Sequence, residues 1–503
     1  MSQWLLLSVA CATGAAVMII ELMGVRLMAP WFGQSQLVWT NVIGVVLASL
    51  AVGQWLGGRW AEHRRHPKPT TLLIIAGALS IASPDIVRLV SPLVLPDDLG
   101  LEEAYPFVTL GSLLVSFVAV GVPMLAMGAV APWLVRLSRE ASEAPGRVAG
   151  AILAAGTLGS LLGTFGATHV LLGAFGSSLT VRFAGGLLLV AGLVLAVGNG
   201  GVTKGALLTL LVPAMSIPWP ERERSSHVLE SVTTPYQDVR VELDADGTRL
   251  LRINEGLDSF HSAYRPGDLW TDRYFDAFVV PALMAPESDD GARSICVIGL
   301  GGGTMARQVQ VVIPDARILG IELDDRLVDL GREWFGLPDS VSVAGGVDGR
   351  LALHVVQEQF GAILVDAYAQ QIYLPPHLCT REFFEEVKAK LLPGGVAALN
   401  LSGRTREDPV VSAVASTFAR VFPNASMARI PWSRNMILVG WNGDGPAIGE
   451  VRRELQQAGV MDHLGWFVDG DLFSPVLPAD GEELVDGNAP VEALAHAAWK
   501  PRS

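Results

Sequence analysis

Six apolar segments between residues 5 and 197 constrain the fold of this chain most strongly. Each is long enough to cross the hydrocarbon core of a bilayer, where a helix satisfies its own backbone hydrogen bonds. They run over Leu5–Met28, Val38–Leu56, Thr71–Val90, Phe107–Leu134, Val148–Leu172 and Leu179–Val197. The sequence therefore predicts an α-helical transmembrane bundle, followed from about Glu221 by a half with the mixed composition of a globular α/β domain.

Three parts follow from this change in composition. We expect a multi-span transmembrane domain over residues 1–220, a linker with a small β-hairpin element over 221–265, and an α/β domain over 266–503. The hairpin is predicted from alternating residues in Tyr236–Leu243 and Arg249–Asn254, joined by a turn at Asp246-Gly247. A seventh apolar stretch, Ala206–Trp219, is short and contains two prolines, so we expect it to be interfacial or re-entrant.

Charge in the loops predicts how the bundle is oriented. Basic residues cluster in Arg59–Lys68 and again at Arg136, Arg139 and Arg147, and such loops favour the cytoplasmic side. With the N-terminus inside, six spans return the chain to the cytoplasm. We therefore expect a multi-pass protein of the cytoplasmic (inner) membrane, in contact with the lipid bilayer, whose second half is cytoplasmic.

Charged residues within the predicted spans include Glu21, Arg26, Asp85 and Arg88. Charged groups are costly in lipid and usually face a partner or a cavity. They indicate either a substrate path or contact site for the second half, or structural ion pairs and side chains that reach the interface. Small residues, as in Gly159-x-x-x-Gly163, predict close packing between helices.

Composition excludes several other classes of protein. The formal net charge is −14, and no basic stripe is available to neutralise phosphates, so a nucleic-acid partner is not expected. Only three cysteines are present, Cys11, Cys296 and Cys379, and their spacing suits neither a metal site nor a disulfide framework. We accordingly predict no bound metal, and a reducing compartment for the second half.

A glycine-rich motif in the second half indicates nucleoside binding. The strand Ile295–Ile298 runs into Gly299-x-Gly301-x-Gly303, a helix is expected over Thr304–Ile313, and Glu322 closes the next strand. Glycines let the backbone approach a ligand, and an acid about 20 residues further on takes ribose hydroxyls. The spacing fits an S-adenosyl-type donor, so we predict that Gly299, Gly301, Gly303 and Glu322 bind the donor.

The α/β pattern continues beyond this unit. A strand is expected at Val341–Val343, a helix begins at Asp348-Gly349, and a buried strand ends at Asp366; a helix over Thr380–Leu391 and a strand over Val396–Leu401 follow. Ligands of open α/β sheets bind at the carboxyl ends of strands, where Glu322, Asp348 and Asp366 are expected to converge. The pattern predicts a Rossmann-like domain of the type found in S-adenosylmethionine-dependent methyltransferases.

From about Val228 to Gly403, with a weaker tail to Glu492, the sequence resembles the spermidine synthases, the polyamine aminopropyltransferases. The first half is similar to the multi-span segment of bacterial membrane-fused members, especially in Glu21–Pro30. The resemblance implies a transferase that moves an aminopropyl group from decarboxylated S-adenosylmethionine to a small amine such as putrescine. It also makes a homodimer one expected assembly.

The resemblance implies a role for individual residues. Asp366 matches the catalytic aspartate that accepts the amine proton. Glu322 matches the ribose-binding acid, Asp348 the acid that contacts the adenine amine, and Gln237 a glutamine that contacts the donor. Tyr274 matches a tyrosine of the acceptor channel. Three of these residues also have a structural alternative. Asp348 and Asp366 are then acids of a helix cap or a turn, and Tyr274 is an aromatic residue of the core.

Two acids of the family pattern are missing. The family's glycine loop contains an aspartate that holds the donor's ammonium group, and here Gly302 occupies that place. A second acid, which recognises the acceptor, is replaced by Ala369. A charge-assisted contact of this kind contributes about 1.5–3 kcal/mol, so the loss of both predicts a weaker reaction with ordinary diamines. Asp276, Glu255 and Asp258 are the candidates for compensation, and we assign Asp276 to the substrate site.

Two alternatives to aminopropyl transfer stay open. The same site could bind ordinary S-adenosylmethionine and transfer its methyl group to a small or membrane-derived acceptor, because only the attacked carbon differs. In the other alternative the first half is a transporter or sensor and the second half a regulatory nucleoside-binding module. Full biological activity after Asp366→Asn would favour this non-enzymatic alternative.

Overall fold

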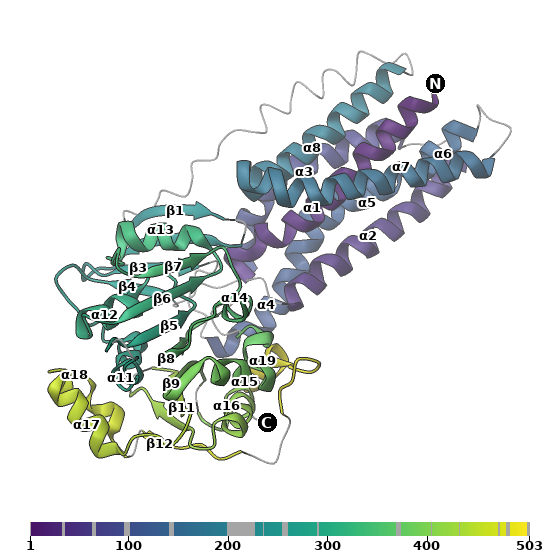
Figure 1. The fold of residues 1–503 in the computed structure, drawn as a ribbon. Helices are drawn as coiled ribbons and strands as arrows, with labels where there is room; N and C mark the ends of the chain where they lie inside the picture. The colour runs from purple at the N-terminus through teal and green to yellow at the C-terminus, as the bar shows by residue number, and fades with distance from the viewer. Residues whose placement is uncertain are drawn as a thin grey trace. The chain divides into compact units, whose positions relative to one another are not determined.

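The computed structural model of the chain describes residues 2–32, 36–62, 67–94, 101–139, 145–198, 227–234, 236–253, 260–288, 291–368, 374–403, 405–431, 433–470, 473–478 and 483–499. They form two compact units, one mainly within residues 1–226 and one mainly within residues 227–503 (Figure 1). The predicted seventh apolar stretch, Ala206–Trp219, lies outside the described residues.

The first unit is a bundle of long apolar helices. Among the described residues, six helices are long and apolar enough to cross a membrane, which confirms the six predicted spans; they cover Gln3–Ala29, Gln36–Glu62, Pro69–Val94, Thr109–Ser138, Gly146–Leu171 and Ala174–Val197. By length and composition these are the helices of a multi-pass membrane protein. The elements of this unit are α1 (Gln3–Phe32), α2 (Gln36–Glu62), α3 (Pro69–Val94), α4 (Leu101–Ser116), η1 (Phe117–Gly121), α5 (Val122–Gly128), α6 (Val130–Arg139), α7 (Pro145–Gly166), η2 (Ala167–Leu171) and α8 (Leu172–Gly198).

Glycines let helices α1 and α7 approach each other closely. A Cβ atom at Gly159 or at Gly163 would collide with the backbone of Cys11 or Ala15, respectively. No side chain therefore fits between the two helices at these positions. The close packing predicted from Gly159-x-x-x-Gly163 is confirmed.

An ion pair joins helices α3 and α8. The Nη2 atom of Arg182 donates to both carboxylate oxygens of Asp85 at 3.0 Å. Asp85 is thus a structural ion-pair residue of the bundle, one of the two interpretations of the charged residues in the spans. Arg182 is a partner that the sequence analysis did not single out.

The second unit contains two sheets. The smaller is antiparallel, with the order β1-β2-β3-β4 and the bounds β1 (Val228–Thr233), β2 (Asp238–Leu243), β3 (Arg249–Ile253) and β4 (Ser262–Tyr264). Strands β2 and β3 are the predicted hairpin, with Val241 opposite Leu251.

The larger sheet has eight strands in the order β12-β10-β11-β9-β8-β5-β6-β7. Strands β7, β6, β5, β8 and β9 are parallel to one another, and β11, β10 and β12 continue the sheet with antiparallel pairing. The strands are β5 (Ser294–Ile298), β6 (Arg317–Glu322), β7 (Ser342–Gly345), β8 (Phe360–Val365), β9 (Leu391–Ser402), β10 (Ser426–Arg429), β11 (Asn435–Trp441) and β12 (Phe473–Pro475).

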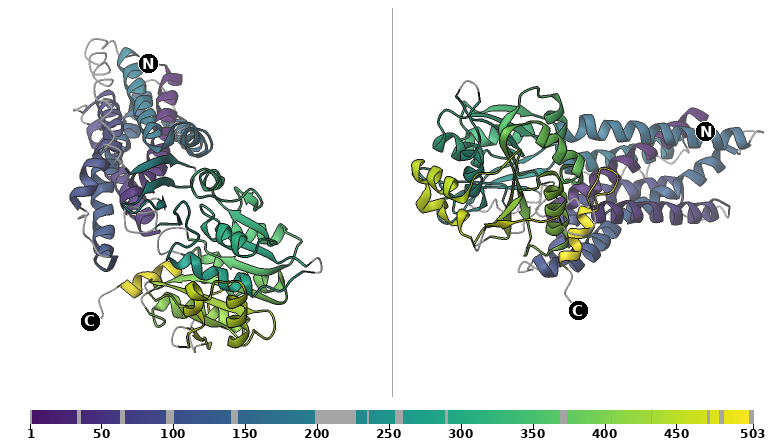
Figure 2. Two further views of the ribbon diagram at one scale, coloured as in Figure 1. Left: turned by 90° about the vertical axis from the view of Figure 1, so that its left-hand side faces the viewer. Right: turned by 60° about the horizontal axis from the view of Figure 1, so that its bottom comes forward.

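Helices cover both faces of the larger sheet (Figures 1 and 2). Strand β5 shows why: Ile295 and Val297 pack into the core on one face, whereas Cys296 and Ile298 pack into the core on the other. The helical elements of this unit are η3 (Tyr274–Phe278), α11 (Val279–Leu283), α12 (Thr304–Val312), α13 (Asp325–Trp334), α14 (Gly349–Val355), η4 (Pro376–Leu378), α15 (Arg381–Ala389), α16 (Pro409–Val421), α17 (Ile448–Gln457), α18 (Met461–Leu464), η5 (Gly465–Val468) and α19 (Val491–Trp499). The predicted Rossmann-like order of strands and helices is therefore present.

The strand order reverses at β5. After β5 the chain adds β6 and β7 on one side, and it then returns to add β8 and β9 on the other. Loops from neighbouring strands diverge at such a switch point, which leaves a crevice at the carboxyl ends of the strands. The glycine turn, Glu322 and Asp366 all lie at this edge, because they follow or end β5, β6 and β8.

The Asp85–Arg182 pair should contribute to the stability of the bundle. Asp85→Asn or Arg182→Gln leaves one partly buried charge without its partner, so either should lower the free energy of unfolding by about 3 kcal/mol. The exchange of both residues, Asp85→Arg with Arg182→Asp, should recover part of this loss. Thermal unfolding of the detergent-solubilised full chain measures the effect, with Lys68→Gln at an exposed position as the control. Single variants that unfold like the wild type would contradict the role of the pair.

Candidate active site

The turn after β5 is built from glycines in a conformation that other residues rarely adopt. Gly299, Gly301 and Gly303 have φ angles of 84°, 55° and 83°, in the left-handed region. At Gly299 a side chain is also excluded by contact, because a Cβ atom would lie 2.5 Å from the backbone oxygen of Asp366. The predicted glycine pattern thus forms a turn that lies against the end of β8.

Glu322 ends β6 and connects it to the glycine turn. Its carboxylate accepts hydrogen bonds from the backbone N–H of Gly301 at 2.7 Å and from that of Asp324 at 3.0 Å. Burial raises the pKa of Glu322 to about 6, although these N–H groups favour the charged form. Each carboxylate oxygen accepts more than one hydrogen bond, so Glu322 retains capacity to accept bonds from the hydroxyls of a ligand.

Asp366 follows the buried strand β8. Its backbone N–H donates to the oxygen of Ile298 at 2.8 Å, which fixes it beside the start of the glycine turn. Its Oδ1 accepts from Nδ2 of Asn400 at 2.8 Å, and its Oδ2 accepts from the hydroxyl of Tyr274 at 3.1 Å. Burial raises the pKa of Asp366 to about 6, and the two hydrogen bonds oppose this only in part. A carboxylate with this pKa is suited to accept a proton near neutral pH.

Tyr274 is the first residue of η3, and its hydroxyl reaches Asp366. Burial first, and then the charge of Asp366, raise the pKa of Tyr274 well above its usual value, so the phenol stays protonated and donates. Tyr274 also packs against the core of the sheet. The structure therefore gives this side chain both a packing contact and a polar contact, and its assignment to an acceptor channel stays a prediction.

Polar residues of the neighbouring strands extend the contacts of Asp366. Asn435 in β11 donates from Nδ2 to Oδ1 of Asn400 in β9 at 2.9 Å. The hydroxyl of Tyr368 donates to the backbone oxygen of Asn400 at 3.0 Å. The sequence analysis named none of these residues. The available signal was Asn400 itself, an amide within the apolar run Val396–Leu401.

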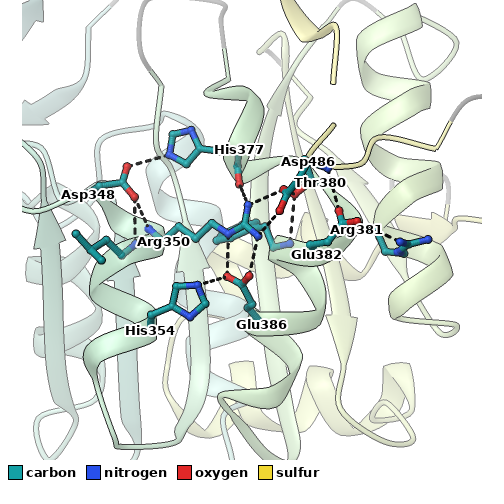
Figure 3. A network of polar contacts seen from close by, with 11 residues as sticks. Asp348, Arg350, His354, His377, Thr380, Arg381, Glu382, Glu386 and Asp486 are labelled. Atoms are coloured by element: carbon teal, nitrogen blue, oxygen red, sulfur yellow. Dashed lines mark hydrogen bonds and ion pairs between the residues drawn. The ribbon is translucent and has the colours of Figure 1, made fainter. Parts of the chain in front are cut away.

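Asp348 caps helix α14 (Figure 3). Its Oδ1 accepts from the backbone N–H of Arg350 at 3.0 Å and of Leu351 at 3.1 Å, while Oδ2 lies 2.9 Å from Nε2 of His377. Burial alone would raise the pKa of Asp348, but the bonds from Leu351, His377 and Arg350 lower it overall. The alternative that Asp348 is a helix cap is thus correct, and its contact with adenine stays a prediction.

Arg350 connects three distant segments near Asp348 (Figure 3). Its guanidinium donates to both oxygens of Glu386 at 2.7 and 2.9 Å and to both oxygens of Asp486 at 2.7 and 2.9 Å. It also donates to the backbone oxygen of His377 at 3.1 Å. The paired carboxylates raise the pKa of Arg350. Helix α14, the chain after β8 and the segment before α19 are thereby held together.

Asp276 is 2% exposed and lies in a separate cluster. Its carboxylate accepts from Gln308 at 2.6 Å, from His463 at 2.9 Å, from the hydroxyl of Thr271 at 2.6 Å and from backbone N–H groups. Asp272, Asp276 and His463 place three potential metal ligands within 4.8 Å of one another. Because both oxygens of Asp276 already accept hydrogen bonds, we interpret it as an anchor for η3. Its assignment to the substrate site stays a prediction.

Several known proteins are similar in sequence to part of the chain. A probable polyamine aminopropyl transferase from Bifidobacterium longum is 32% identical over 244 residues, which cover 44% of this chain and 53% of the relative. A polyamine aminopropyltransferase from Chromobacterium violaceum is 30% identical over 133 residues, which cover 26% and 51%. The eEF1A lysine and N-terminal methyltransferase of Bos taurus is 30% identical over 202 residues, which cover 36% and 29%.

Part of the chain is similar to the spermidine synthase/polyamine aminopropyltransferase family. No family model matches the chain. The chain spans about half the length of the two aminopropyltransferase relatives. A solved structure, a probable spermidine synthase from Corynebacterium glutamicum, aligns with a TM-score of 0.38 at 23% identity, over 52% of this chain and 98% of that one.

At Gly302, where the family pattern has an acid, the structure leaves little space for a side chain. The N–H of Gly302 donates to Oγ of Ser262 at 2.8 Å. A Cβ atom at Gly302 would lie 3.0 Å from the Ser262 side chain and 3.1 Å from Phe335. A carboxylate-bearing side chain therefore needs rearrangement of its neighbours at this position.

The remaining assigned residues lie in a turn of the small sheet or outside the described part of the chain. Gln237 lies in the turn between β1 and β2, where its backbone exchanges hydrogen bonds with Thr234. Its contact with a donor stays a prediction. Ala369, Glu255 and Asp258, which bear on recognition of the acceptor, are outside the described residues.

Two glycines allow the close approach at the turn to be tested. Gly346→Ala changes a residue with φ of 72° and open space around it, so it should cost about 1 kcal/mol of stability from backbone strain alone. Gly299→Ala adds a collision with the backbone of Asp366 to a similar strain, and should cost about 3 kcal/mol or more. Thermal unfolding of both variants measures the difference. Equal losses would contradict the close contact between the glycine turn and the end of β8.

Proposed function

We propose that the chain is a membrane-anchored polyamine aminopropyltransferase. In this proposal it transfers an aminopropyl group from decarboxylated S-adenosylmethionine to a small amine such as putrescine. The observation that carries the proposal is Asp366, a buried carboxylate of raised pKa beside the glycine turn. Similarity to polyamine aminopropyltransferases supports the reaction class.

The chemistry requires a base at this position. When bound, the donor supplies an electrophilic carbon next to a positively charged sulfur. The amine nitrogen forms a bond to that carbon, the carbon–sulfur bond breaks, and its electron pair stays on sulfur. The proton of the amine goes to Asp366, whose charged form is supported by Asn400 and Tyr274. With a pKa of about 6, Asp366 is a stronger base than an ordinary aspartate and is still ionised at pH 7.

The donor would be held at the carboxyl edge of the sheet. Glu322 retains acceptor capacity for ribose hydroxyls, and the glycines allow the backbone to approach the ligand. Asp348 would accept from the adenine amine through Oδ2, which lies 2.9 Å from Nε2 of His377 and can accept a second hydrogen bond, whereas Oδ1 already accepts two from helix α14. Gln237 would add a donor contact. The carboxylates of Glu322 and Asp348 fit a nucleoside, since each carboxylate oxygen can accept more than one hydrogen bond.

The membrane half would keep the site at the cytoplasmic face. Basic loops near Arg59–Lys68 and Arg136 support an inside N-terminus and therefore a cytoplasmic second half. The adenosyl donor is available in the cytoplasm, which agrees with this orientation. In this proposal the bilayer anchors the enzyme and does not supply the acceptor.

Methyl transfer is the second candidate, and the contact at Gly302 favours it. Ser262 and Phe335 occupy the space around the position where the family resemblance implies an ammonium-binding acid. Without that acid, a donor that keeps its carboxylate would meet less electrostatic opposition. Purified full chain offered each donor separately distinguishes the two reactions. Transfer from neither donor, with any of the candidate amines, would contradict both.

The pH dependence of transfer should follow Asp366. Because the charged form acts as base, the rate at saturating substrate should fall about tenfold for each pH unit below the pKa of about 6. Asp366→Asn should lower the rate about 1000-fold without loss of thermal stability, since an amide can accept from Asn400 and donate to the Tyr274 oxygen. A variant that keeps most of the rate would exclude Asp366 as the base.

A further inference from the structure

Asp366 receives one of its hydrogen bonds from an amide that could face it in either of two ways. An asparagine side chain has an acceptor end and a donor end, which exchange places when the amide rotates by half a turn. Nδ2 of Asn400 faces Asp366 and donates at 2.8 Å. In the reversed orientation, the oxygen of Asn400 would face the carboxylate, and the two acceptors would repel each other unless Asp366 carried a proton.

Asn435 determines which end of Asn400 faces Asp366. It lies on β11, the strand next to β9, and donates from Nδ2 to Oδ1 of Asn400 at 2.9 Å. Asn400 is 1% exposed, so water does not readily replace this donor. Reversal of the Asn400 amide would bring two N–H donors face to face.

Asn435 is in turn fixed by its neighbours. The hydroxyl of Ser433 donates to Oδ1 of Asn435 at 2.8 Å and accepts from the backbone N–H of Asn435 at 3.1 Å. With its oxygen used by Ser433, the amide of Asn435 presents its N–H to Asn400. The order Ser433, Asn435, Asn400, Asp366 is therefore a chain in which each donor faces an acceptor.

We infer that Asn435 is a positioning residue for the base: through Asn400, it keeps a hydrogen-bond donor on Asp366 and so keeps this carboxylate ionised. The inference rests on the proposed function, because it matters for catalysis only if Asp366 accepts the proton of the amine. Asn435 itself does not touch Asp366; it acts across strand β9.

The remaining groups around Asp366 do not substitute for this contact. Tyr274 from η3 donates to the other oxygen, Oδ2. Tyr368, whose pKa rises well above its usual value mainly through burial and then through the charge of Asp366, donates to the backbone of Asn400 instead. Since burial already raises the pKa of Asp366 to about 6, loss of the donor on Oδ1 would raise it further.

Asn435→Asp in the full chain tests the inference. A carboxylate at position 435 attracts the N–H of Asn400, so the amide should reverse and turn its oxygen toward Asp366. Asp366 should then hold its proton to a pH higher by about one unit or more. The infrared band of protonated carboxyl groups, assigned to Asp366 by its absence in Asp366→Asn, reports this midpoint directly and needs no catalytic activity. In transfer assays, the acid limb of kcat should move the same way, with little change in KM.

Controls separate this effect from general damage. Ser433→Ala removes only the group that fixes Asn435, so it should fold and give a smaller shift in the same direction. Asn442→Asp makes the same chemical change at the far end of β11, where Asn442 donates to the backbone of Leu391, and should leave the midpoint unchanged. An Asp366 midpoint equal to that of the wild type in both Asn435→Asp and Ser433→Ala would overturn the inference. A shifted midpoint in a protein that transfers from neither donor would support it and contradict the proposed function.

Discussion

The burial of one carboxylate, that of Asp366, is the constraint on which the site depends. A charged group at the end of a buried strand is unfavourable unless other groups solvate it. Asn400 and Tyr274 do this from two different elements, and the backbone of Asp366 is bonded to Ile298 beside the glycine turn. Asp366, the turn and the neighbouring strands are consequently fixed relative to one another.

Much of the fold could be predicted because its signals are local. Six apolar runs predict six helices, and a strand, glycines, a helix and Glu322 in this order predict the βαβ unit. The edge that carries Glu322 and Asp366 also follows, since carboxyl ends of parallel strands lie together. The expected strand boundaries differ from the observed ones by only a few residues, as for β9, which begins at Leu391 rather than Val396.

What the sequence did not reveal depends on contacts between distant residues. Asn400 and Asn435 lie on neighbouring antiparallel strands, and only the register of β9 with β11 brings them together. The charge of Arg182 is visible within the predicted span Leu179–Val197, but its pairing with Asp85 on another span is not. Asp276 was assigned to the substrate site as a replacement for the missing acids, and this stays a prediction; its contacts with Gln308 and His463 join distant residues and could not be read from the sequence.

The guanidinium of Arg350 has a consequence for how the chain acquires its structure. Its two carboxylate partners include Asp486, which is 136 residues further on. A ribosome synthesises the chain from the N-terminus, so helix α14 emerges long before the segment that completes its ion pairs. Helix α14 therefore gains its second carboxylate partner only after Asp486 has been synthesised. Contacts of such long sequence separation slow folding, because a long loop must be closed before they can form.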